Sequence, residues 1–175
     1  QTIPGVNAVS VSGNICTDKK VSSVNALLGR GKYVIAECSI SHALCEKYLR
    51  TTPKKIVDLN IKKNLVGSIV NGGVQSANAH VANMLLAFYI ATGQDAANII
   101  EGSQSITYAE VDTETGALHF SVTLPNIIIG TVGGMKQLPH FKEAFTRMGC
   151  SPNDTPGDAS RRLAECTAAC VLAGE

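Results

Sequence analysis

The chain has 175 residues, of which 45% are hydrophobic and 17% charged, and its formal net charge is +1. This length suits one domain with a substantial core. The small net charge, without a Lys/Arg cluster interleaved with aromatic residues, argues against a nucleic-acid-binding protein. The longest apolar runs, residues 84–91 and 168–173, are too short to span a bilayer, so we expect no membrane contact by this segment.

Neither end of the chain has the features of a natural terminus. Residues 1–5 contain no initiator methionine, charged start or apolar core, so they are not a signal peptide. Residues 171–175 continue an apolar helical pattern. We therefore expect a segment of a longer protein.

The six cysteines are expected to be buried free thiols rather than a disulfide framework. None forms a C-x-x-C pair, and most lie within apolar segments. Cys166 and Cys170 are one helical turn apart, which is too few ligands for a metal site.

Periodicity and turn residues predict the elements in chain order. A strand-like run at residues 8–12 ends at a glycine and is followed by a polar loop. Helices are predicted at residues 22–28, 41–49, from 53 through 63, and at 81–92, 95–100, 139–148 and 158–175. Further strands are predicted at residues 32–40, 106–111 and 117–124, the last two flanking a hairpin loop that ends in glycine.

These elements predict an α+β fold, because helices and paired strands come in runs with little β-α alternation. The helix at 81–92 is apolar on nearly all sides, which is typical of a helix at the centre of a protein. We expect this central helix to be surrounded by other helices and a small antiparallel sheet.

The loop at residues 13–20 carries an acid and two lysines side by side, Asp18, Lys19 and Lys20. Local pattern alone favours a solvated turn. The alternative is a loop that presents an ammonium group to a developing oxyanion, with a carboxylate holding that ammonium in place.

Other candidate residues also have a structural interpretation. The glycine-rich loop at 130–134 suits close approach of an anion to the backbone, or a simple strand-to-helix turn. His80, with Asn83 one turn later, fits a buried core histidine or a ligand-binding pair. Lys63 fits a solvated helix end or an anion contact, and Asp95 fits a helix cap.

Several motifs follow one another along the whole chain, and their joint order is more specific than any one of them. They are residues 12–20 (SGNICTDKK), 29–32 (GRGK), 63–68 (KNLVGS), 78–83 (NAHVAN), 93–97 (GQDAA), 130–134 (GTVGG) and 171–175 (VLAGE). This succession resembles the catalytic domain of the 3-hydroxy-3-methylglutaryl-coenzyme A (HMG-CoA) reductases, of the NADPH-dependent class shared by eukaryotes and archaea. By this resemblance, residues 1–20 are the end of the small cofactor-binding domain with the connecting loop, and residues 21–175 are part of the large substrate-binding domain.

The resemblance implies an oxidoreductase of the mevalonate pathway, which reduces HMG-CoA to mevalonate and CoA with two hydrides from NADPH. Lys19 corresponds to the lysine that stabilises the oxyanion at the thioester carbonyl, and Asp95 to the aspartate that holds this lysine. The implied substrate-binding residues are Ser12, Asn14, Asp18, Lys20, Lys63, His80 and Asn83, and the implied cofactor-binding residues are Thr131, Gly133 and Gly134. No metal is implied.

The chain departs from the family pattern at two places. Gln75 and Ser76 stand where members usually carry two glycines, and Met135 stands where a third glycine is common. Each substitution puts a side chain where the backbone would otherwise approach a ligand.

The resemblance also implies parts that lie outside this sequence. The family's catalytic glutamate and main cofactor motif come upstream, and the histidine that protonates the departing thiolate comes downstream. We therefore expect residues 1–175 alone to be inactive, because hydride transfer needs its donor held against the carbonyl.

The expected assembly is a homodimer or homotetramer. The expected location faces the cytoplasm, at the endoplasmic reticulum membrane in a eukaryote or free in solution in an archaeon. The alternative is that the chain belongs to a non-catalytic paralogue, which binds HMG-CoA or has a regulatory role.

Overall fold

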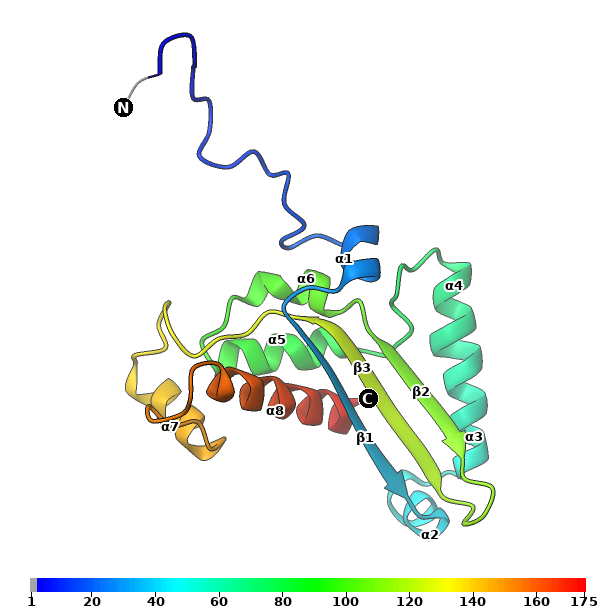
Figure 1. Ribbon diagram of the computed structural model, residues 1–175. Coiled ribbons are helices and arrows are strands. Elements are labelled where there is room, and N and C mark those ends of the chain that lie inside the picture. The colour runs from blue at the N-terminus through cyan, green and yellow to red at the C-terminus, as the bar shows by residue number, and fades with distance from the viewer. Residues whose placement is uncertain (1–2) are drawn as a thin grey trace.

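The N-terminal segment lies apart from the folded body. The computed structural model describes residues 3–175, so the first two residues of the predicted segment 1–20 lie outside the described residues. Residues 3–12 extend away from the body without forming a helix or strand (Figure 1). The strand predicted at residues 8–12 is therefore wrong. Val9 and Val11 are 92% and 108% exposed, and an alternating pattern forms a strand only where a neighbouring strand pairs with it.

A three-stranded antiparallel sheet, in the order β1–β3–β2, is the centre of the body. Its strands are β1 (Lys32–Ile40), β2 (Ile106–Val111) and β3 (Leu118–Ile127). β3 continues three residues beyond the predicted end at Leu124, because Lys32 pairs with Ile127 while Val34 pairs with Leu124. Pro125 lies in this irregular stretch, where a missing N–H is tolerated.

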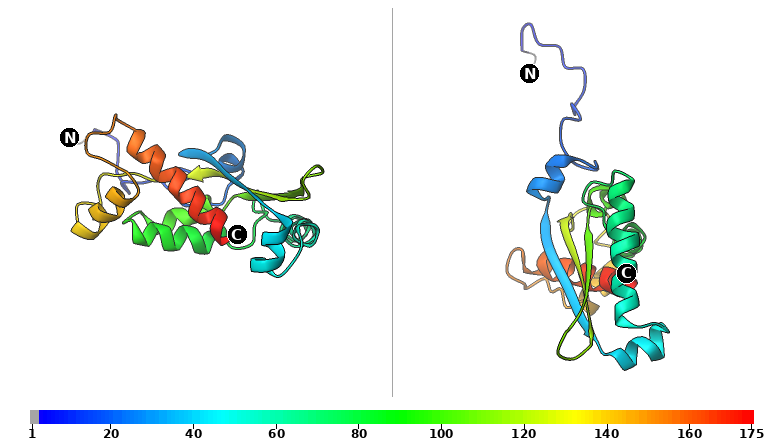
Figure 2. Two further views of the ribbon diagram at one scale, coloured as in Figure 1. Left: turned by 90° about the horizontal axis from the view of Figure 1, so that it is seen from below. Right: turned by 90° about the vertical axis from the view of Figure 1, so that its right-hand side faces the viewer.

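One face of the sheet is covered by two helices, α5 (Val81–Ala91) and α8 (Asp158–Gly174), which also pack against each other (Figures 1 and 2). A helical rod formed by α3 (Pro53–Leu59), η2 (Asn60–Gly67) and α4 (Ser68–Val70) lies along β2. The remaining helical segments are α1 (Ser23–Leu28), α2 (His42–Leu44), η1 (Cys45–Leu49), η3 (Ala96–Asn98), α6 (Ile99–Gly102) and α7 (Pro139–Arg147). The α+β class with a small antiparallel sheet is confirmed.

The main core lies between β3, α5, α7 and α8. Its fully buried side chains include Leu85, Tyr89, Val122, Leu124, Ile127, Leu163 and Val171. α5 contributes to it through Val81, Leu85 and Tyr89, which are four residues apart and share one face. The other side of α5 is open, and Ile90 is 61% exposed. No element of residues 3–175 covers that side, so the other helices and the sheet surround α5 on its core side.

The cysteines differ in how far they are buried. All six cysteines are free thiols, but Cys16 is exposed and only Cys45 is fully buried, so the predicted burial holds in part. Within residues 3–175, no helix has both the length and the apolar character needed to cross a membrane. The same residues contain no cluster of three or more His, Cys, Asp or Glu side chains that could hold a metal ion.

Candidate functional site

The loop at residues 13–20 is held against α1 by one buried amide. Asn25 is 1% exposed, and its side-chain nitrogen donates to the carbonyl oxygens of Thr17 at 2.9 Å and Lys20 at 2.8 Å. α1 itself begins where the Ser22 hydroxyl accepts a hydrogen bond from the Asn25 N–H. The short helix therefore fixes both ends of the Thr17–Lys20 turn, which carries the charged residues.

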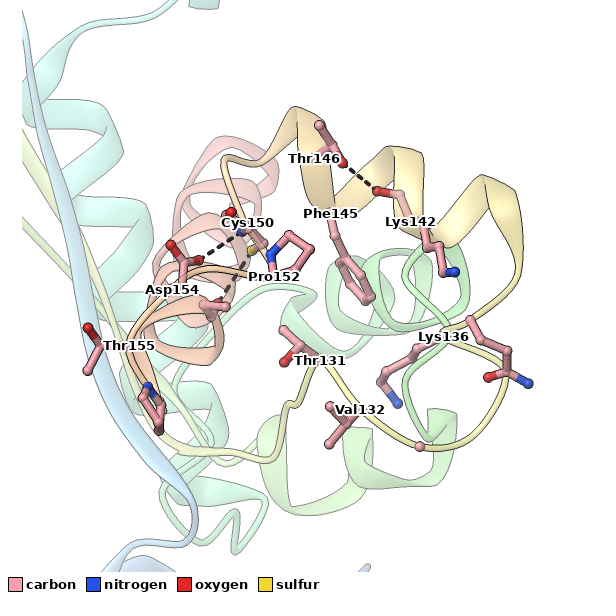
Figure 3. A pocket seen from close by; sticks show the side chains of 16 residues that line it. Thr131, Val132, Lys136, Lys142, Phe145, Thr146, Cys150, Pro152, Asp154 and Thr155 are labelled. Atoms are coloured by element: carbon pink, nitrogen blue, oxygen red, sulfur yellow. Dashed lines mark hydrogen bonds between the residues drawn. The ribbon is translucent and has the colours of Figure 1, made fainter.

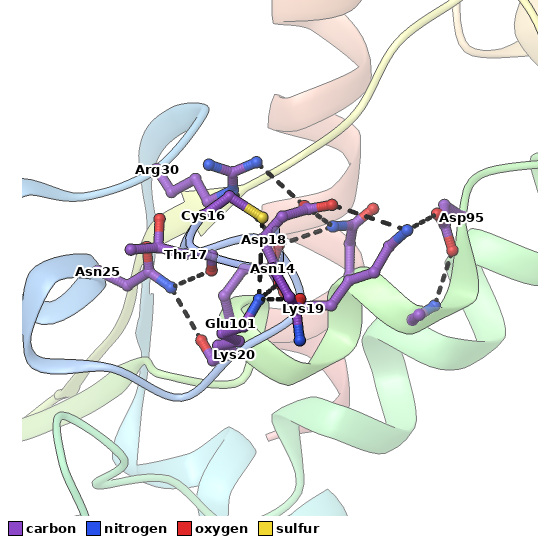
Figure 4. A network of polar contacts seen from close by, with 12 residues as sticks. Asn14, Cys16, Thr17, Asp18, Lys19, Lys20, Asn25, Arg30, Asp95 and Glu101 are labelled. Atoms are coloured by element: carbon purple, nitrogen blue, oxygen red, sulfur yellow. Dashed lines mark hydrogen bonds and ion pairs between the residues drawn. The ribbon is translucent and has the colours of Figure 1, made fainter. Parts of the chain in front are cut away.

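Lys19 and Asp95 form the closest ion pair of the site. The Lys19 Nζ lies 2.7 Å from an Asp95 carboxylate oxygen and 3.7 Å from Asp18, so it stands between two acids (Figure 4). Lys19 has a φ of 54°, a left-handed conformation that is uncommon for a residue with a side chain and is typical of functional sites. Its side chain is 41% exposed and that of Asp95 is 54% exposed, so a ligand can reach the pair.

Mutual contact shifts both pKa values in the direction that keeps the pair charged. The hydrogen bond to Asp95 raises the pKa of Lys19 above its ordinary value. The bond from Lys19, and then the bond from the backbone N–H of Ala97, lower the pKa of Asp95. Asp95 also caps η3 through that Ala97 bond of 3.1 Å, so the capping interpretation and the ion-pair interpretation are both correct.

Asp18 is held from the opposite side by Arg30 and Asn98. One of its carboxylate oxygens accepts from Arg30 Nη2 at 3.0 Å and from Asn98 Nδ2 at 3.1 Å. Burial acts to raise the pKa of Asp18, but the bonds from Asn98 and Arg30 outweigh it and the pKa is lowered. Asp18 is therefore an anion at neutral pH and part of a charge network, not a solvated turn residue.

Lys20 turns back into its own loop rather than outward. Its Nζ donates to the side-chain oxygen of Asn14 at 2.9 Å and to the carbonyl oxygen of Asp18 at 3.1 Å. Asn14 has a φ of 54°, and its backbone N–H donates to the Ser12 hydroxyl at 3.3 Å. The predicted substrate-binding residues Ser12, Asn14, Asp18 and Lys20 therefore form one bonded cluster around Lys19.

The glycine-rich loop is tied to the same region by Gln94. The Gln94 amide donates to the Gly130 carbonyl at 2.9 Å and accepts from the Gly130 N–H at 3.1 Å. Beyond this clasp, Gly133 and Gly134 have φ values of 77° and 58° and are exposed. A Cβ at Gly133 would meet no atom within 4 Å, so the backbone here is open to a ligand.

A cavity of about 670 Å³ lies between this loop and α7 (Figure 3). Its lining includes Thr131, Gly133, Lys136, Lys142, Phe145 and Asp154. This volume is in the range of small-molecule sites, and the two lysines suit an anionic group. Lys19 and Asp95 are not among the lining residues, so the cavity adjoins the ion pair rather than containing it.

Three predicted site residues lie elsewhere in the structure. His80 and Asn83 are at the start of α5, while Asp95 follows its end, and eleven helical residues separate these positions by about 16 Å. Lys63 is on η2, exposed, on the rod beside β2. Residues 3–175 therefore do not bring Lys63, His80 and Asn83 together with Lys19.

His80 has its own set of contacts. Its Nε2 lies 2.6 Å from the Gly174 carbonyl oxygen, and because a carbonyl can only accept, Nε2 carries the proton. The backbone N–H groups of Ala79 and His80 donate to the Glu175 carboxylate at 2.8 and 2.7 Å. The end of α8 therefore fixes the start of α5 and the orientation of this ring.

Sequence comparison identifies the family. The family model described as hydroxymethylglutaryl-coenzyme A reductase matches residues 1–175. The chain belongs to this family. It is 47% identical to 3-hydroxy-3-methylglutaryl-coenzyme A reductase of Pyrococcus horikoshii, over 100% of this chain and 42% of that relative. It is 45% identical to the enzyme of the same name from Phycomyces blakesleeanus, over 98% of this chain and 15% of that relative.

The same similarity extends to plants. Reductase 1 of Oryza sativa subsp. japonica is 45% identical over 98% of this chain and 33% of its own length. The chain therefore spans less than half the length of the curated HMG-CoA reductases it matches. The membership predicted from the order of the motifs is confirmed.

Sequence reasoning missed several residues that build the site. Asn25, Asn98 and Glu101 are buried in the structure and were not predicted to contribute. Arg30 lies in the motif at residues 29–32, to which no functional role was assigned from the sequence. The only available signal was their polarity within or beside apolar helices, since a buried polar side chain needs a partner.

Proposed function

We propose that this chain forms part of an HMG-CoA reductase active site, which reduces HMG-CoA to mevalonate and CoA. Its contribution is the loop at residues 13–20, which carries Lys19, and the acid Asp95. The single observation that carries the proposal is the 2.7 Å contact between Lys19 Nζ and Asp95, within reach of solvent. An ammonium that is held in place and charged at neutral pH suits a carbonyl oxygen that becomes negative during the reaction. Family membership supplies the substrate class.

The proposed chemistry assigns one task to each residue. When a hydride adds to the thioester carbonyl carbon, the electron pair of the C=O bond moves to oxygen, and Lys19 stabilises that oxygen. Asp95 keeps Lys19 protonated and aimed, since it lowers the free energy of the ammonium form. Asp18 and Asn14 shape the loop, and the ammonium of Lys20 holds the carboxylate end of the substrate.

NADPH is the proposed hydride source when bound. Thr131, Gly133 and Gly134 would hold it, because Thr131 is partly exposed, the two glycines are exposed, and Gly133 leaves room for close approach. Lys136 and Lys142 line the adjoining cavity and would favour the anionic part of a nucleotide.

Self-association is part of the proposal. Apolar side chains are exposed on α1, where Leu27 and Leu28 are 83% and 81% exposed, and on the rod, where Ile69 and Val70 are 65% and 82% exposed. Exposed apolar surface of this kind is typical of protein interfaces. A homodimer or homotetramer would cover it, and light scattering of the purified protein measures the assembly.

The test uses the product of the complete open reading frame that contains this chain. We expect oxidation of NADPH that depends on HMG-CoA, and a fall in kcat of about 10²–10³ in Lys19→Ala, the range for loss of one oxyanion donor. Lys55→Ala, at an exposed position on α3, is the matched control and should keep wild-type rates. Residues 1–175 alone should show no turnover.

Two results would contradict the proposal. Wild-type rates in Lys19→Ala would remove the oxyanion role. Tight binding of HMG-CoA without any NADPH oxidation by the complete protein would favour the non-catalytic paralogue instead.

A further inference from the structure

Glu101, on α6, is the only charged side chain of residues 3–175 that is buried, with no exposed surface at all. Burying a carboxylate is costly unless other groups neutralise and bond it. One oxygen of Glu101 has such partners, but Oε2 has no hydrogen-bond partner in the described structure. A carboxylate therefore stands where an apolar side chain would stabilise the fold at least as well, which calls for another explanation.

The partners of Glu101 are the same two residues that hold Asp18. Its Oε1 accepts from Asn98 Nδ2 at 2.7 Å and lies 3.6 Å from Arg30 Nε. The same Asn98 nitrogen, and Arg30 Nη2, donate to Asp18 at 3.1 and 3.0 Å. Arg30 and Asn98 thus each contact both the buried carboxylate of Glu101 and the carboxylate of Asp18 in the loop. Figure 4 labels Arg30, Asp18 and Glu101.

The exposed fraction of these side chains increases from Glu101 to Asp18, so Glu101 is the least mobile of them. Asn98 is 4% exposed, and the side chains of Arg30 and Asp18 are 31% and 33% exposed. Glu101 is thus the fixed end, because it cannot turn to solvent, whereas Arg30 on its own could. The Arg30 guanidinium bonds Asp18 through Nη2 and lies 3.6 Å from Glu101 through Nε, which has no hydrogen-bond partner, so it is the charge of Glu101 that restricts its orientation.

We propose that Glu101 is a positioning residue, which through Arg30 and Asn98 fixes Asp18 and with it the loop that presents Lys19. It touches no substrate in this scheme. Its effect on the loop follows from the contacts alone, while its effect on substrate binding rests on the proposed function.

The loop contains its own reporter, because trypsin cleaves after lysine. Cleavage after Lys19 or Lys20 requires the Thr17–Lys20 turn to open, and its rate follows the population of the open form. In Glu101→Gln of the complete protein, the amide oxygen can still accept from Asn98, but the charge that pairs with Arg30 is lost. We expect cleavage to be about tenfold faster, the difference between a hydrogen bond to a charged group and one to a neutral group. Cleavage after Lys47, on η1, should not change.

A matched control separates positioning from general loss of stability. Thr107 is 4% exposed, and its hydroxyl bonds Asn60 and the Ala77 carbonyl in a network remote from the loop. Thr107→Val should lower the melting temperature without accelerating cleavage after Lys19. Equal acceleration in Thr107→Val and Glu101→Gln would overturn the proposal. Arg30→Lys, at a partly exposed position, should accelerate cleavage as well, because an ammonium cannot bridge both carboxylates.

Binding of HMG-CoA, measured by calorimetry, tests the functional part. If Glu101 acts through Asp18, Glu101→Gln should weaken binding about tenfold in the wild-type background and not measurably in Asp18→Asn. Equal weakening in both backgrounds would contradict a role through Asp18. Absence of HMG-CoA binding by the wild-type protein would contradict the proposed function, while the trypsin result would still decide the positioning role.

Discussion

Replacement of Asn25 should release the charged loop from α1. Asn25→Ala removes the two hydrogen bonds from its amide to the Thr17 and Lys20 carbonyls, at 2.9 and 2.8 Å. A net contribution of about 1 kcal/mol for each bond gives a loss of about 2 kcal/mol. Thr17 and Lys20 are only partly buried, so water can reach their freed carbonyls and the loss should not be much larger.

Hydrogen exchange of peptides that cover residues 17–29 measures this loss locally. The N–H groups of Ala26 and Gly29 are bonded within α1, so they report its opening. A loss of about 2 kcal/mol corresponds to exchange about thirtyfold faster. Leu27→Ala is the control on the same helix, because Leu27 is 83% exposed and should leave exchange unchanged.

The isosteric Asn25→Asp variant sharpens the test. It replaces the donating amide by a carboxylate that faces two carbonyl oxygens, so burial and repulsion should raise the pKa of the new acid. The destabilisation should therefore be greatest at neutral pH, about 3–5 kcal/mol for an uncompensated buried charge, and smaller below that raised pKa. Exchange in Asn25→Ala within twofold of wild type, or a pH-independent Asn25→Asp defect, would refute the reasoning.

Three further predictions concern other parts of the chain. Asp95→Asn should lower the pKa of Lys19 and so increase its rate of reductive methylation near pH 9. The wild-type pair should persist from below about pH 4 to above about pH 10.5, since the Asp95 pKa is lowered and the Lys19 pKa raised. An unchanged methylation rate would argue against the ion pair. Gln75→Gly should raise the melting temperature, because Gln75 has a φ of 51° and a left-handed residue costs about 1 kcal/mol; a lower melting temperature would show that its side chain stabilises the turn. Leu85→Ala should lose about 2–5 kcal/mol in urea unfolding and Ile90→Ala little, because only the first is buried; similar losses would contradict the one-sided packing of α5.

Local sequence signals were sufficient where local physics decides the outcome. Ser22 and Asp95 cap short helices as their residue types suggest, and residues 32–40 and 106–111 form strands. The strand expected at residues 8–12 failed because alternation cannot supply a pairing partner. The family was also predictable, because ordered motifs are a global signal.

The support of the site was not predictable from the sequence. Glu101 follows two isoleucines on a short helix, and no periodicity indicates that it turns inward. Its role depends on Arg30, which it contacts, and on Asp18, and both are far from it in the sequence. Contacts between residues so distant in sequence are set by tertiary packing, which local patterns do not describe.

The pair of hydrogen bonds between Gln94 and Gly130 couples two parts of the site. One amide uses both its donor and its acceptor on a single backbone residue, so two hydrogen bonds join the glycine-rich loop to the residue before Asp95. A ligand that displaces Gly130 would therefore also displace Gln94, the residue before Asp95, and with it the carboxylate that contacts Lys19. Binding of a ligand at the glycine-rich loop would then change the position of the Lys19 ammonium, and the Gln94 side chain would connect the two.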